Sequence, residues 1–148
     1  ATGDVFVRNS KGGGLVGENR NSARISNSYA TGNVQGDETI GGLVGVNWIQ
    51  GYIENTTYSI GEVNGETEIG GFVGRQGPHG SNVDDGFWDI ETSKIETSDG
   101  GIGKTTDELM SYETFEDWDI SRESELDMES PTIWSIVENE EYPKLTVE

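Results

Sequence analysis

The chain has 148 residues, of which 28 are Asp or Glu and 9 are Lys or Arg, giving a formal net charge of -19. It has 22 Gly and one His, lacks Cys, and is 31% hydrophobic. These values exclude disulfides and zinc–thiolate sites, and they argue against binding nucleic acid, which requires a basic patch. No apolar run approaches the roughly 18 residues of a membrane-spanning helix, so we expect no membrane insertion.

Charge and glycine are unevenly distributed along the chain. Residues 1–80 hold 8 acidic and 5 basic side chains, whereas residues 81–148 hold 20 acidic and 4 basic ones. The first part has 18 of the glycines and the second has 4. Composition therefore predicts a glycine-rich region followed by a strongly acidic one.

A glycine-bounded segment recurs through the first region. The sequence GGLVG at 13–17 returns at 41–45, and as GGFVG at 70–74, in steps of 28 and 29 residues. Short β-branched segments bounded by glycine at such a period are typical of solenoids. We predict an all-β fold, a parallel β-solenoid of about three coils over residues 1–90, with two or three strands in each coil.

Equivalent residues of successive coils would lie about 4.8 Å apart and form ladders. The predicted apolar ladders are Leu15/Leu43/Phe72, Ile25/Ile53/Val83, Tyr29/Tyr58/Trp88 and Val5/Val34/Val63. A polar ladder of Asn27, Asn55 and Asp85 is expected beside them, because stacked amides hydrogen-bond along a stack. Such ladders would explain how a chain with few apolar residues fills a narrow core.

The repeat resembles a known family. The pattern Gly-Gly-Leu-Val-Gly-x-Asn followed by Ile-x-Asn-Ser-Tyr-Ala-Thr-Gly, over 13–36 and again with changes over 41–65, is similar to the GLUG-motif repeat. The segments 87–93, 101–106 and 142–145 also resemble those that commonly follow such repeats. The resemblance implies a secreted or cell-surface protein of bacteria or archaea, often adhesin-like, and it implies no reaction.

The acidic region, residues 91–148, is predicted to be an α/β cap that closes the last coil. Residues 105–110 are predicted to form a short helix with Thr105 or Thr106 as N-cap, and 132–137 with 143–147 a β-hairpin. We expect Trp118, Trp134 and Tyr142 to be buried against the last coil.

Two motifs suggest catalysis or nucleotide binding only superficially. Residues 100–106, GGIGKTT, resemble a phosphate-binding loop, but Ser98 stands where the pattern needs Gly and no buried apolar strand precedes it. A glycine turn before an N-capped helix is the better interpretation. His79, the single His, lies in a Gly-Pro-His-Gly turn, which is a poor support for a catalytic base. We therefore expect no enzymatic activity.

Calcium is the ligand that the acidic residues would suit best, and no other cofactor is expected. The candidate ligands are Asp84, Asp85 and Asp89 in one group and Asp117 and Asp119 in another. The second group begins like a calcium loop, but Arg122 and Met128 occupy the positions that need Gly and Glu. The acidic excess is better explained as a solubilising surface of a halophilic, salt-adapted protein.

The sequence therefore predicts a non-catalytic structural or adhesive module of an extracellular or cell-surface protein. Its expected partners are neighbouring coils or copies of itself, added head-to-tail into a filament through the apolar segment 5–7. The alternative is a carbohydrate-binding or substrate-presenting module of a secreted hydrolase, with surface glycans as partners. Exposed side chains along one face, such as Trp48, Ile49 and Tyr52, would favour that alternative.

Overall fold

A computed structural model describes residues 1–79 and 81–146 of the chain. The chain divides into two compact units, residues 1–104 and 105–148. Among the described residues, no helix has the length and apolar character of a membrane span.

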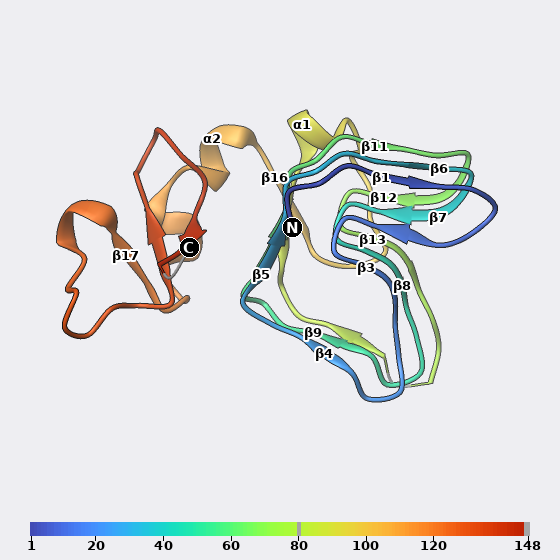
Figure 1. The fold of residues 1–148 in the computed structure, drawn as a ribbon, viewed down its shortest axis with the longest axis horizontal. Helices are drawn as coiled ribbons and strands as arrows, with labels where there is room; N and C mark the ends of the chain where they lie inside the picture. The colour runs from blue at the N-terminus through green and yellow to red at the C-terminus, as the bar shows by residue number, and fades with distance from the viewer. Residues whose placement is uncertain (80, 147–148) are drawn as a thin grey trace. The chain divides into compact units, whose positions relative to one another are not determined.

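The first unit is a parallel β-solenoid (Figure 1), which confirms the predicted fold class. Each strand pairs in parallel with its equivalent in the next coil. The five sheets are β1(Val5–Val7)-β6(Val34–Gly36)-β11(Val63–Asn64), β2(Gly12–Gly13)-β7(Glu38–Gly41)-β12(Thr67–Gly70), β3(Val16–Asn19)-β8(Val44–Asn47)-β13(Val73–Gln76), β4(Arg24–Ile25)-β9(Tyr52–Ile53)-β14(Asn82–Val83) and β5(Ser28–Ala30)-β10(Thr57–Ser59)-β15(Phe87–Asp89)-β16(Ile102–Lys104).

A coil contains five short strands, so the expectation of two or three was wrong. Residues with left-handed backbone conformations divide the coil into shorter pieces. Asn27, at φ 43°, interrupts the segment that was expected to run as one strand from Ile25 to Tyr29. Thr39 (φ 52°) and Glu68 (φ 49°) adopt this conformation at equivalent positions of successive coils. The backbone bends are therefore part of the repeat.

Apolar ladders fill the interior of the solenoid in the register that the repeat predicts. Val34 lies between Val5 and Val63, and Ile53 lies between Ile25 and Val83. In the remaining aliphatic ladder, Leu15 N–H donates to Leu43 O at 3.0 Å, and Leu43 N–H donates to Phe72 O at 2.9 Å. Leu43 and Phe72 are completely buried. Like residues thus stack on like residues through the core.

The aromatic ladder differs from the prediction in its last coil. The Tyr29 and Tyr58 rings stack with centroids 5.2 Å apart, but Tyr58 pairs with Phe87, and Trp88 pairs with Ser59. The Trp88 side chain instead packs into the core, and its indole N–H donates to Ile95 O at 3.0 Å. Small residues in the preceding coils, Ala30 and Ser59, leave room at this position for the large indole.

A buried amide ladder lies at a corner that the sequence analysis did not single out. Asn19 Nδ2 donates to Asn47 Oδ1 at 2.9 Å, and Asn47 Nδ2 donates to the carbonyl oxygens of Gly51 (3.1 Å) and Asn82 (3.0 Å). The predicted Asn27/Asn55/Asp85 ladder does not form in that register. Asn27 N–H donates to Thr56 Oγ1 at 3.0 Å. The bend at Asn27 shifts the pairing by one residue between Ile25↔Ile53 and Ser28↔Thr57.

We expect Asn47→Leu to lower the free energy of unfolding by about 2 kcal/mol, because it leaves buried carbonyl groups without their donor. Asn47 is completely buried, whereas Asn55 is exposed. Asn55→Leu is the matched control and should stay within about 0.5 kcal/mol of the unmodified chain. Urea denaturation followed by far-ultraviolet circular dichroism measures both. Equal losses would contradict the assignment of the amide ladder to Asn19 and Asn47.

Residues 90–104 cover part of one end of the solenoid. Thr97 O accepts from Gly71 N–H (3.0 Å), Ser98 Oγ accepts from Val73 N–H (2.8 Å), and Asp99 Oδ2 accepts from Gln76 N–H (2.6 Å). Helix α1 (Ile90–Ser93) precedes residues 97–99, and strand β16 follows them and pairs with β15. The compact unit therefore extends past the boundary at residue 90 expected from the sequence, because these residues cover the edge of the third coil.

The second unit contains helix α2 (Thr106–Leu109), strands β17 (Ile120–Arg122), β18 (Trp134–Ile136) and β19 (Lys144–Leu145), and the 3-10 helices η1 (Tyr112–Phe115) and η2 (Glu123–Glu125). Thr105, one of the two predicted N-cap residues, is the N-cap of α2, and it forms a capping box with Glu108. Strands β18 and β19 form the predicted antiparallel pair. The Trp118 ring packs against Trp134 at 5.1 Å between centroids, so these residues contribute to a core inside their own unit.

Candidate functional surfaces

The aspartates proposed as calcium ligands in the first unit have structural partners. The Asp89 side chain is buried and caps helix α1, where its Oδ1 accepts from the N–H groups of Glu91 (2.8 Å) and Thr92 (3.0 Å). Asp84 accepts from Tyr52 O–H at 2.6 Å and from Asn82 Nδ2 at 2.9 Å. Asp85 is exposed beside Asp84 in a shallow groove. These three carboxylates therefore have different structural environments.

In the second unit, Asp117 and Asp119 are both exposed, and Asp119 Oδ2 accepts from Ile133 N–H at 3.2 Å. Across residues 1–79 and 81–146, no group of three or more His, Asp or Glu side chains is arranged to hold a metal ion. Within the described part of the chain, the five candidate aspartates therefore form no such group.

The glycine loop and the single histidine occupy turns. Gly100 (φ 143°) and Gly101 (φ 81°) adopt backbone conformations that favour glycine and pack against Val83 and Phe72. Strand β16 and the N-capped helix α2 follow directly, in agreement with the glycine-turn interpretation. His79 is exposed and also has positive φ, at 73°.

Shifted pKa values occur at side chains that have a hydrogen-bonding partner. The hydrogen bond donated by Thr39 Oγ1 lowers the pKa of Glu68, with a further contribution from Arg75. The hydrogen bond from Arg122 lowers the pKa of Glu138. The Tyr52 pKa is raised because its hydroxyl donates to the Asp84 carboxylate. In each case a structural partner explains the shift.

The surface proposed for sugar binding does not present free aromatic rings. The Arg75 guanidinium lies 5.0 Å from the centroid of the Trp48 ring, and that of Arg24 lies 4.5 Å from the Tyr52 centroid. Each guanidinium covers one ring face by a cation–π contact. Ile49, which lies between Trp48 and Tyr52 in the sequence, is 36% exposed. One face of each ring is therefore covered by an arginine.

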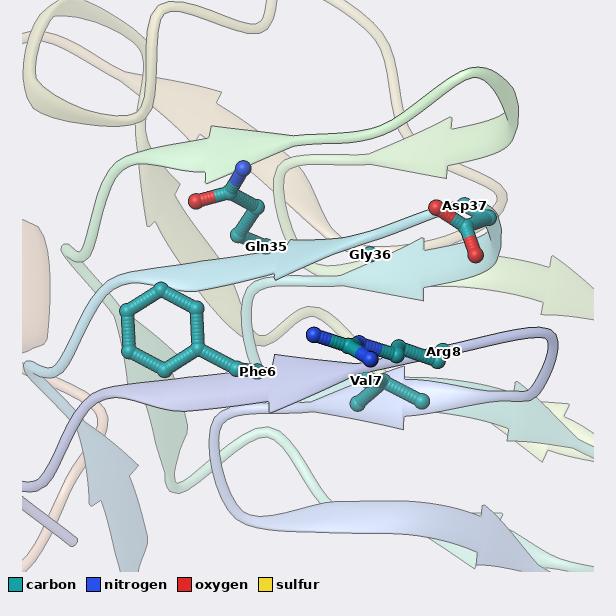
Figure 2. A pocket seen from close by; sticks show the side chains of 6 residues that line it. All are labelled: Phe6, Val7, Arg8, Gln35, Gly36 and Asp37. Atoms are coloured by element: carbon teal, nitrogen blue, oxygen red, sulfur yellow. The ribbon is translucent and has the colours of Figure 1, made fainter.

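The most exposed aromatic side chain lies elsewhere, on strand β1. Phe6 is 75% exposed and contributes to two shallow grooves on the outer face of the β1-β6-β11 sheet. The larger groove has a volume of about 460 Å³ and is shown in Figure 2, where Phe6 and Arg8 project from the β1 segment and Gln35 from β6. It also includes Asp37. We call these two grooves the Phe6 surface.

A second candidate binding surface is the edge of the first coil. Strands β1 to β5 each lie at the end of a sheet. Of these strands, β5 meets preceding chain on its outer side, where the Ala1 ammonium donates to Tyr29 O at 2.8 Å and Thr31 N–H donates to Ala1 O at 2.9 Å. Leu15, the first member of its ladder, is partly exposed at this edge. This edge combines backbone hydrogen-bonding groups with part of the apolar core, and we call it the open edge.

The fold and its ladders define the first unit as a β-solenoid repeat protein. Comparison with protein families gives the particular repeat: the family model described as the GLUG motif matches residues 9–35. This match confirms the resemblance identified from the sequence. No curated protein and no solved structure matches the chain.

Proposed function

We propose that this chain is a non-catalytic structural module of an extracellular or cell-surface protein, and that its open edge receives another β-coil. The open edge is the observation that carries the proposal. Strands β1 to β4 lie at the ends of their sheets, and an unpaired strand edge is a template for further pairing. The extracellular location is supported by the GLUG repeat and by the acidic surface, and antibody labelling of intact source cells would test it.

The partner coil that we propose is a neighbouring solenoid coil of the same protein or the open edge of a second copy. Head-to-tail addition, which the sequence analysis favoured, would need a free edge at the other end of the solenoid. Residues 97–99 already bond to the backbone of β13 and its preceding turn, and Lys94 pairs with Glu62 at 2.8 Å beside β11. Contact between two open edges is isologous and closes as a dimer, so it does not extend into a filament.

Light scattering over a range of concentrations tests this proposal. We expect the unmodified chain to dimerise, and the variant Leu15→Lys to remain monomeric because it places a charge on the open edge. Ile102→Lys is the matched control, since Ile102 is a 38% exposed apolar residue in β16, beyond the third coil. It should dimerise like the unmodified chain.

Hydrogen exchange keeps the test valid if the Leu15→Lys variant unfolds. In the unmodified chain, amides of β3 should gain protection as the concentration rises, whereas those of β16 should not. A monomer at every concentration, with no change in protection, would overturn pairing between copies.

A further inference from the structure

We propose that the Phe6 surface is a binding site for neutral carbohydrate chains. Its central feature is an aromatic ring that the fold does not require. Phe6 pairs in register with Gln35, and Gln35 pairs with Asn64, so the equivalent positions of the next two coils carry exposed amides. The neighbouring inward positions, in contrast, hold valine in all three coils. A phenylalanine on the outer face therefore adds apolar surface without adding to the core.

The groups around this ring suit a sugar. The CH groups of a pyranose ring form an apolar face that packs on an aromatic ring, while its hydroxyls both donate and accept hydrogen bonds. Arg8 and Gln35 supply donors beside Phe6, and Gln35 and Asp37 supply acceptors. On the other side of Phe6, the smaller groove of about 210 Å³ adds Asn64 and Asp4. The larger groove, about 460 Å³, falls within the usual range for small-molecule sites.

Several of these polar groups are available to a ligand. Among the residues that the structure describes, Arg8 forms no ion pair, although Lys11, Arg24, Arg75 and Lys94 each pair with a glutamate. Gln35 and Asn64 form no hydrogen bond through their side chains with any described residue. Asp37 uses Oδ2 to accept from Asn9 N–H at 3.0 Å. A guanidinium without a partner is unusual in a chain of net charge -19.

Charge selects a neutral ligand over an acidic one. The Phe6 surface has one cation, Arg8, against the carboxylates of Asp4, Asp37 and Glu62. Glu62 is neutralised by Lys94, but the two aspartates would repel a polyanion. Neutral hydroxyls can instead donate to these carboxylates. The occupant that fits this surface is therefore an uncharged polysaccharide or oligosaccharide.

Native affinity electrophoresis tests the inference, with gels that contain laminarin, galactan, mannan, dextran or polygalacturonate. We expect at least one of the four neutral polysaccharides to retard the protein. Phe6→Ala should weaken that binding about tenfold or more, and Phe6→Trp should retain it. Ile133→Ala, which removes a 41% exposed apolar side chain from the second unit, is the matched control and should bind normally.

Three results would each overturn the inference: no retardation by any neutral polysaccharide, retardation by polygalacturonate alone, or unchanged binding by Phe6→Ala. Phe6 is largely exposed, so its variants should keep the melting temperature of the unmodified chain. The site goes beyond the structural role proposed above. The variant Leu15→Lys separates the two, because Leu15 lies on the open edge and lines neither groove of the Phe6 surface, so this variant should still bind the polysaccharide.

Discussion

Leu43→Asp should unfold the solenoid or lower its free energy of unfolding by several kcal/mol. Leu43 is completely buried and lies between Leu15 and Phe72 in the middle coil. A carboxylate at this position would lose its hydration and would have only apolar neighbours along the ladder. The total stability of a domain is about 5–15 kcal/mol, so this single change removes a large part of it.

Glu66→Lys is the control for this experiment, because Glu66 is exposed. We expect it to change the free energy of unfolding by no more than about 0.5 kcal/mol. Urea denaturation followed by far-ultraviolet circular dichroism compares the two variants. If both variants had the free energy of unfolding of the unmodified chain, Leu43 could not be part of a packed ladder.

Gly42→Ala should lower the free energy of unfolding by about 3 kcal/mol, although it adds only one methyl group. A Cβ at Gly42 would collide with the carbonyl oxygen of Gly71 in the next coil and lie 2.9 Å from Ser59 Oγ. The neighbouring backbone cannot yield without breaking its pairing, since Gly42 N–H donates to Gly70 O at 3.1 Å. The coils approach too closely at this turn for any side chain.

Gly3→Ala is the matched control for Gly42→Ala. A Cβ at Gly3 would meet no atom within 4 Å. We therefore expect no loss of stability, and a gain of up to about 1 kcal/mol is reasonable because alanine restricts the unfolded chain. The same denaturation experiment applies. A Gly42→Ala variant as stable as Gly3→Ala would contradict the close contact between coils.

The Phe6 surface was only partly accessible to sequence reasoning. Residues 5–7 are recognisable as an apolar β segment, but the sequence suggests that all three contribute to an edge. Alternation along β1 leaves Val5 and Val7 partly buried and turns Phe6 outward. The surface also needs Gln35 and Asp37, which only the pairing of β1 with β6 brings beside it. Conversely, Trp48 and Tyr52 looked available in the sequence, and their arginine partners appear only in the folded chain.

The repeat, the parallel solenoid and the ladders of Leu43, Ile53 and Val34 all follow from the period of the sequence. A fixed period leaves one way to stack like residues on like residues, so local pattern and tertiary contact agree. The end of the last coil depends instead on contacts between residues that the period does not relate. Trp88 takes an interior position because Ala30 and Ser59 are small in the coils before it, and residues 97–99 bond to the edge that the third coil would otherwise expose. The period predicts neither the position of Trp88 nor the bonding of residues 97–99. A terminal coil has no next repeat, and pairing with that repeat would otherwise define its register and cover its edge.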